Sequence, residues 1–219
     1  MPLLRLILRL FFRKPAMFGL DRIQRDQPAV FVSNHLGAHS PILLTLHFPI
    51  PFRPWAHAHV TRIADCRDYL EENFTRHSLK LKPPFSRWLA ALLARPAVWV
   101  MRKVRAIPVY RGSPAIHRTF ALSLDTLKKG DSLLIFPEDK FTPFSDRVHD
   151  FFPGFTLLSR LYRKETGQEL PFYPLYVDRK KHTVRIGQAM VFGAGETSRG
   201  KYRAMAGKLR DAVDALGRN

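Results

Sequence analysis

Short apolar runs alternate along this chain with longer segments in which apolar residues recur every three or four positions. The apolar runs are typical of buried β-strands, and they lie at residues 29–33, 53–60, 106–110, 132–136, 172–177 and 183–186. The periodic segments predict helices at residues 41–46, 65–74, 86–94, 115–127, 154–162 and 201–216. Strands that alternate with helices favour a largely parallel sheet flanked by helices on both faces. The sequence therefore predicts a single α/β domain over residues 20–219.

The first nineteen residues have a different pattern. Arg5, Arg9 and Arg13 recur every four residues, so a helix would place them along one stripe. Phe11 and Phe12 add apolar surface beyond a single core-facing stripe. We therefore expect residues 1–19 to form an amphipathic helix that binds a membrane surface through these five residues. The alternative is a helix packed on the domain with its arginines in water.

The net positive charge of the chain limits the kinds of molecule that it is expected to bind. The chain has 219 residues, 46% of them hydrophobic, and a formal net charge of +18. A surface this basic attracts anionic lipid headgroups, nucleic acid, CoA phosphates and acidic carrier proteins. The sequence has no zinc-finger spacing, no aromatic RNA-binding signature and no basic tail, so nucleic acid is not an expected partner. An anionic membrane surface remains the favoured one.

The number of cysteines and the hydropathy of the chain indicate where in the cell the protein is expected. Cys66 is the only cysteine, which excludes a disulfide framework and a thiolate metal cluster. Residues 3–12 form the most apolar segment, but two arginines interrupt it, and neither a membrane span nor a cleavable secretory signal is evident. We expect a peripheral protein on the cytoplasmic face of a membrane, without a metal or a resident cofactor.

Polar side chains follow three of the predicted strands. His35 comes after the first strand, Arg111 after the strand at 106–110, and Glu138 with Lys140 after the strand at 132–136. Ligands of parallel α/β sheets bind outside the carboxyl ends of the strands. Histidine is a general base near neutral pH, and arginine binds phosphate with two-pronged geometry. This combination suits removal of a proton from the hydroxyl of a phosphorylated substrate.

At these positions the sequence resembles the glycerolipid acyltransferase family, which includes the lysophosphatidic acid acyltransferases. The family has four ordered blocks, and this chain has a counterpart to each: VSNH at 32–35, IPVYRG at 107–112, FPE at 136–138 and LPFYPL at 170–175. The segment FPGF at 152–155 resembles the link between the third and fourth blocks. The resemblance covers roughly residues 20–192.

The resemblance implies a function and a mechanism. The family transfers a fatty acyl group from acyl-CoA or acyl carrier protein to the free hydroxyl of a lysophospholipid such as 1-acylglycerol-3-phosphate, in phospholipid biosynthesis. By this likeness His35 is the catalytic base, Arg111 binds the substrate phosphate, and Glu138 and Lys140 support the phosphate-binding site. The lysophospholipid and the acyl thioester are then the substrates, and the thioester is a co-substrate, not a cofactor.

Two positions depart from the family pattern. Ser40 stands where the family has the aspartate that orients the histidine, and serine brings no negative charge to that catalytic position. Phe141 stands where the third block has arginine, with Lys140 one residue earlier. Three outcomes follow: Asp65 or Asp139 replaces the missing aspartate, the substrate differs, or catalysis is lost. The alternative function is therefore a non-catalytic lipid- or membrane-binding protein on the same scaffold.

Two further groups of residues admit more than one interpretation. His57 and His59 share one face of a predicted strand, yet no third ligand at a metal-binding spacing accompanies them. Phe85, Trp88 and Trp99 lie among leucines and are predicted to belong to the core, although an exposed patch of such residues would enter a membrane.

Overall fold

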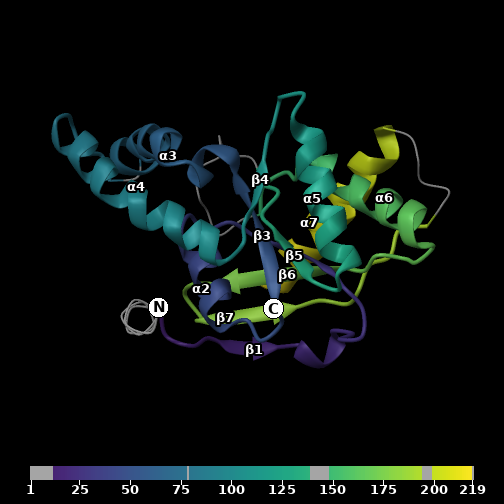
Figure 1. Cartoon of the computed structure of the whole chain (residues 1–219). Helices are drawn as coiled ribbons and strands as arrows, with labels where there is room; N and C mark the ends of the chain where they lie inside the picture. Colours follow the sequence, from purple (N-terminus) through teal and green to yellow (C-terminus); the bar gives the residue numbers. More distant parts are fainter. Residues whose placement is uncertain (1–11, 78, 139–147, 194–198, 219) are drawn as a thin grey trace. The chain divides into compact units, whose positions relative to one another are not determined.

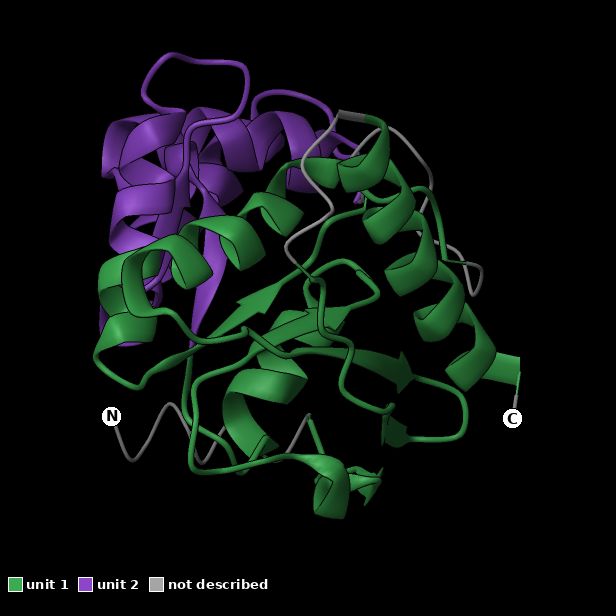
Figure 2. Cartoon of the chain, turned by 90° about the vertical axis from the view of Figure 1, so that its right-hand side faces the viewer, with its two compact units in different colours: residues 1–52, 124–219 green, residues 53–123 purple. Residues whose placement is uncertain are grey.

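The computed structural model describes residues 12–77, 79–138, 148–193 and 199–218. The helix predicted at the amino terminus, with Arg5, Arg9 and Phe11, lies almost wholly outside these residues, and so do Asp139, Lys140 and Phe141. The chain divides into two compact units, each described by itself: residues 1–52 with 124–219, and residues 53–123 (Figure 2).

The first unit is built on five strands in the order β1-β7-β6-β2-β5. Their bounds are β1 Ala16–Phe18, β2 Val30–Ser33, β5 Ser132–Ile135, β6 Phe172–Asp178 and β7 Thr183–Ile186. β2 pairs in parallel with β5 and β6, β1 pairs in parallel with β7, and only β6 and β7 run antiparallel among these pairs. The predicted α/β class with a largely parallel sheet is confirmed.

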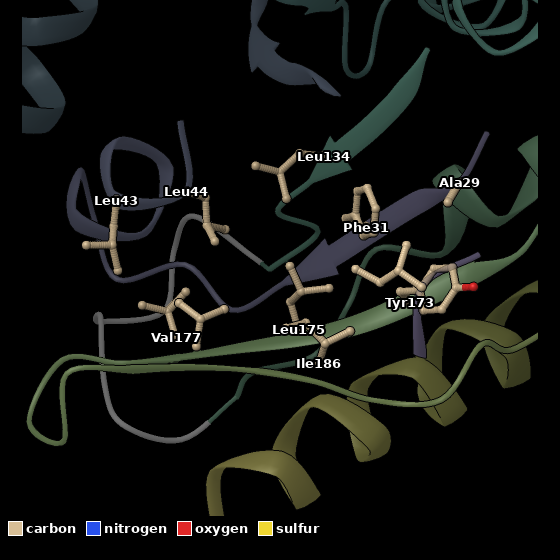
Figure 3. Close-up of a cluster of buried hydrophobic side chains, with 11 residues drawn as sticks. Ala29, Phe31, Leu43, Leu44, Leu134, Tyr173, Leu175, Val177 and Ile186 are labelled. Atoms are coloured by element: carbon tan, nitrogen blue, oxygen red, sulfur yellow. The ribbon is translucent and has the colours of Figure 1, made fainter. Parts of the chain in front are cut away.

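The alternation of side chains along β6 separates the two faces of this sheet. Tyr173, Leu175 and Val177 belong to a buried cluster with Phe31 and with α2 (His39–His47) (Figure 3). On the other face, the Phe172 ring lies 6.2 Å from the ring of Phe155, and Tyr176 lies close to Gly217 of α7 (Arg199–Arg218). The helices thus cover both faces, as the sequence predicts.

The remaining helix of this unit, α6 (Leu157–Thr166), follows a 3-10 turn at Pro153–Thr156. It ends at Gly167, whose φ of 74° is a left-handed conformation that glycine adopts without strain. Leu158 and Tyr162 lie one turn apart on the buried side of α6. The helix therefore has the single apolar stripe from which it was predicted.

The second unit contains a parallel pair of strands, β3 (Phe52–His57, whose first residue falls in the first unit) and β4 (Ile107–Val109). Two helices follow β3 and pack on each other, α3 (Ile63–Leu70) and α4 (Phe85–Lys103) (Figure 1). A π-helical turn at Glu71–Arg76 extends α3. The boundary between the units falls within α5 (Ile116–Lys128).

The prediction that Phe85, Trp88 and Trp99 belong to the core is wrong. Their exposed fractions are 71%, 67% and 38%. The side of α4 that packs on α3 instead holds small side chains, including Ala94 and Val98. Bulky and small apolar residues both occur along α4 and lie on different sides of it, so apolar character alone did not identify the buried side.

No helix in the described ranges is both long enough and apolar enough to cross a membrane. Although α4 has 19 residues, it contains Arg87, Arg95, Arg102 and Lys103.

Candidate functional site

The carboxyl ends of β2 and β5 bring the first and third sequence blocks together. Val32 and Ile135 are partners in the parallel register, so the chain leaves both strands at the same edge. Two residues beyond the end of β2 comes His35, and three beyond the end of β5 comes Glu138. The structure therefore joins two residues that are 103 positions apart in sequence, at the edge where the strand pattern placed them.

Asn34 fixes the position at which the chain turns out of β2. Its side-chain amide donates a hydrogen bond to the carbonyl oxygen of Val177 over 3.0 Å, and its side-chain oxygen accepts one from the Val177 amide over 2.8 Å. Asn34 is 3% exposed. A buried side chain that satisfies both partners in this way holds the loop against β6. The next residue, His35, is therefore held on a rigid support.

His35 and Glu138 are joined through the main chain. The backbone N–H of His35 donates to Oε1 of Glu138 over 3.2 Å. The imidazole and the Phe136 ring form a T-shaped pair, with 5.2 Å between the ring centroids and 86° between the planes. The carboxylate thus supports the loop that carries the histidine, while an aromatic wall sets the orientation of its ring.

Burial shifts the protonation of both groups toward their neutral forms. It lowers the pKa of the His35 imidazole from 6.5 to about 4, because the charged ring loses hydration. It raises the pKa of the Glu138 carboxyl from 4.5 to about 7, and the hydrogen bond from the His35 amide only partly opposes this rise. At neutral pH the imidazole is therefore unprotonated and able to accept a proton.

Ser40 is fully buried, and its hydroxyl oxygen accepts a hydrogen bond from the backbone N–H of Leu36 over 3.2 Å. The serine therefore closes the turn between His35 and α2. This geometry gives Ser40 a structural role in the loop, which the sequence did not indicate. Whether it also assists the imidazole as a catalytic residue stays a prediction.

The segment after β5 is held by backbone contacts. Glu138 forms an isolated antiparallel bridge with Phe151, and the Phe152 N–H donates to the Pro137 carbonyl over 2.9 Å. The FPE block is thus paired with the segment that leads into Pro153–Thr156, which is the one that resembles the family's link. The position of Glu138 is therefore held by the segment at Phe151 and Phe152 as well as by its own strand, β5.

The other residues predicted for the site belong to the second unit or fall outside the described residues. Arg111 belongs to the second unit, where it follows β4 as an exposed residue of a turn, so its place beside His35 stays a prediction. Asp65 is in the same unit and lies 3.6 Å from Arg62 in an ion pair. The proposed phosphate contact of Lys140 falls outside the described residues.

Phe12 and Arg13 are the described part of the predicted membrane segment. Phe12 is half-buried, its ring lies 5.4 Å from that of His39, and its carbonyl oxygen lies 2.6 Å from Nε2 of His47. Arg13 is exposed. Phe12 thus packs on α2 within the first unit, and a membrane role for the residues before it stays a prediction.

Within the described residues, no group of three or more histidine, cysteine, aspartate or glutamate side chains is placed to hold a metal ion. The chemistry available around His35 is that of an uncharged imidazole, a carboxyl group that titrates near neutrality and main-chain hydrogen bonds. This set suits proton transfer.

No family model and no curated protein matches the sequence. Among solved structures, the chain is similar to the 1-acyl-sn-glycerophosphate (LPA) acyltransferase PlsC from Thermotoga maritima, with a TM-score of 0.60 and 15% sequence identity. The match covers 97% of this chain and 76% of that one. Nearly the whole chain, with its four sequence blocks in order, therefore adopts the fold of a glycerolipid acyltransferase.

Proposed function

We propose that this protein is a glycerolipid O-acyltransferase. It moves a fatty acyl group from the thioester of CoA or acyl carrier protein to the free hydroxyl of a lysophospholipid such as 1-acylglycerol-3-phosphate. The observation that carries the proposal is the pairing of His35 and Glu138 at the carboxyl ends of adjacent parallel strands, in a chain with the fold of an LPA acyltransferase. The four sequence blocks support it.

The reaction needs one base and no redox partner. The neutral imidazole of His35 takes the proton of the acceptor hydroxyl, and the oxygen attacks the thioester carbonyl. The new C–O bond forms, the C–S bond breaks, and the departing sulfur receives the proton from the imidazolium. Arg111 is our proposed ligand for the acceptor phosphate because guanidinium binds phosphate through two hydrogen bonds.

Removal of His35 tests the proposal directly. The purified protein is mixed with vesicles, an acyl thioester and a panel of lysolipids, and the release of free thiol is followed. We expect His35→Ala to lower turnover about 10²- to 10⁴-fold, the usual contribution of a general base. His77→Ala is the matched control because His77 is exposed and lies in the second unit. Equal rates for His35→Ala and the wild type would refute the mechanism.

Ser40→Asp tests the position that departs from the family. A carboxylate there would retain an acceptor for the Leu36 N–H and would favour the protonated imidazole, so we expect the pKa of His35 to rise by about one unit or more. The rate should rise with it. Ser40→Asn is the matched control, since the amide has a similar shape without the charge. A histidine titration followed by NMR, together with thiol release, distinguishes the two variants.

The second candidate, a non-catalytic lipid-binding protein, rests on the same serine. This alternative predicts no turnover with any acyl thioester, and it predicts that His35→Ala still binds vesicles. Restored turnover in Ser40→Asp combined with an inactive wild type would identify the chain as a scaffold whose catalytic base has lost its charged partner.

A further inference from the structure

Helix α4 buries its small side chains and exposes its large ones. Ser86, Ala90, Ala94 and Val98 recur every four residues and are at most 1% exposed. This stripe packs on α3, where Cys66 joins Ala94 and Val98 in a buried cluster. Ser86 is also held in place, because its carbonyl oxygen accepts a hydrogen bond from the Thr75 hydroxyl over 3.1 Å. The orientation of α4 in the second unit is therefore fixed by this packing.

The opposite side of α4 is a continuous apolar stripe. Phe85, Trp88, Leu92 and Trp99 are 71%, 67%, 58% and 38% exposed, respectively. Spacings of three, four and seven residues place all four side chains within one narrow sector of the helix. Scattered exposed apolar residues are ordinary, but two tryptophans, a phenylalanine and a leucine on one side of a helix are the kind of grouping that interaction surfaces contain.

Cations accompany this stripe, and α4 contains no acidic residue. Arg95 and Arg102 continue the same spacing and are exposed, as is Lys103, whose Nζ lies 5.9 Å from the centre of the Trp99 ring. At the carboxyl end of the helix, a hollow of about 280 Å³ is lined by Arg102 together with Arg53 and Arg105. Apolar and cationic groups are thus presented together. We call the four apolar residues with Arg95, Arg102 and Lys103 the α4 face.

We propose that the α4 face docks on the surface of a membrane that contains anionic lipids. The apolar side chains enter the boundary between headgroups and acyl chains, the tryptophans lie at headgroup level, and the cations bind lipid phosphates. The exposed apolar side chains, the cations beside them and the absence of an acidic residue in α4 match the chemistry of a lipid surface with anionic headgroups. The α4 face consists of other residues than the predicted amino-terminal segment, and the inference goes beyond the proposed acyl transfer.

Sedimentation with vesicles tests the electrostatic part. The full-length protein is added to vesicles of phosphatidylcholine with or without phosphatidylglycerol. Neutralising the face with Arg95→Gln, Arg102→Gln and Lys103→Gln should weaken binding to the anionic vesicles about 100-fold. The matched control neutralises three exposed cations outside the face, Arg118, Arg203 and Lys208, in the same way. Equal losses in the two triple variants would overturn the proposal, because net charge alone would then explain binding.

The apolar part is tested by Trp88→Ser with Leu92→Ser. This double variant should bind vesicles at least about tenfold more weakly, since two large side chains no longer leave water. The control is Phe18→Ser with Val191→Ser, whose wild-type side chains are 54% and 52% exposed outside the face. Vesicle binding that is unchanged in the α4 variant would overturn the proposal. It would also be overturned if the wild type formed a dimer and the α4 variant stayed a monomer. In the second case the face would bind another copy of the chain.

Quenching of tryptophan fluorescence tests whether the α4 face contacts the membrane. The chain has three tryptophans, Trp55, Trp88 and Trp99. Lipids with brominated acyl chains should quench the wild type, whereas Trp88→Phe with Trp99→Phe should leave the unquenched emission of Trp55. Equal quenching in both proteins would contradict docking through α4. This readout is independent of turnover, so a protein that binds vesicles but transfers no acyl group would refute the proposed function and leave this inference intact.

Discussion

The two units place their apolar side chains in opposite ways. In the first unit, large residues such as Phe31, Leu134 and Tyr173 fill the space between the sheet and α2, and each is at most 1% exposed. In the second unit, α4 contributes small residues to its buried side and turns its aromatic residues to solvent. Burial of large side chains stabilises a fold, whereas their exposure costs solubility unless a partner covers them. The comparison thus separates a unit with a core of large side chains from a helix that exposes its large side chains, where we propose a docking surface.

The largest expected difference comes from the same substitution in each region. Leu134 is 1% exposed and Leu92 is 58% exposed. Leu134→Ala should lower the free energy of unfolding by about 2–5 kcal/mol, because it leaves a cavity in the core. Leu92→Ala should change it by less than about 0.5 kcal/mol. Urea titration followed by circular dichroism measures both. A comparable loss in Leu92→Ala would show that α4 is covered within the protein.

A smaller effect should appear on the two sides of α4 itself. Ala94 is 1% exposed and packs on α3, whereas Ala91 is exposed. Ala94→Leu should cost about 1–3 kcal/mol through overpacking, and Ala91→Leu should be nearly neutral. The same urea titration compares the two variants. If both leucines are tolerated equally, the small-residue stripe is not the side that fixes the helix.

The smallest effect is a pH dependence of stability in the wild type that arises around His35. Its pKa is lower in the folded state, so it makes stability fall as the pH falls from about 6.5 to about 4. The pKa of Glu138 is higher in the folded state, so it makes stability fall as the pH rises from about 4.5 to about 7. In the wild type these opposite slopes largely cancel between about 4.5 and 6.5.

Single variants should reveal each slope. Relative to the wild type, His35→Ala should gain stability and Glu138→Gln should lose it as the pH falls through this window, each by up to about 1.4 kcal/mol per pH unit. Urea midpoints at several pH values measure the difference. As a control, Glu165→Gln replaces an exposed carboxylate that pairs with Lys128, and it should show little of this slope. Parallel curves for all three variants would exclude opposed titration at the site.

The arrangement of strands and helices was largely predictable because most elements have one clear period. β1 was missed because it has only three residues, of which Met17 packs against the buried cluster while Ala16 and Phe18 are exposed. α4 was predicted too short because Pro96 suggests a break. Leu92 and Pro96 are both exposed, so water can satisfy the carbonyl that loses its helical partner.

Part of the arrangement around His35 was predictable, but its contacts were not. The sequence placed His35 and Glu138 at one edge of the sheet, where the carboxyl ends of parallel strands meet. It gave no indication that the carboxylate would accept the main-chain N–H of the histidine, because any residue has that N–H. Nor did it show that the Ser40 hydroxyl closes the turn, because a serine at that position is equally compatible with a role toward the imidazole.

The two hydrogen bonds between Asn34 and Val177 determine which amino-acid substitutions the loop at His35 can accept. Both bonds are made to the main chain of residue 177, so any residue that keeps the strand there preserves them. Position 34 has no such freedom: an aspartate, whether inherited or formed by slow deamidation, would turn a second acceptor toward a carbonyl oxygen. These two bonds therefore depend on the side chain at position 34 and on the main chain alone at position 177, whose side chain is constrained separately by its burial in the core.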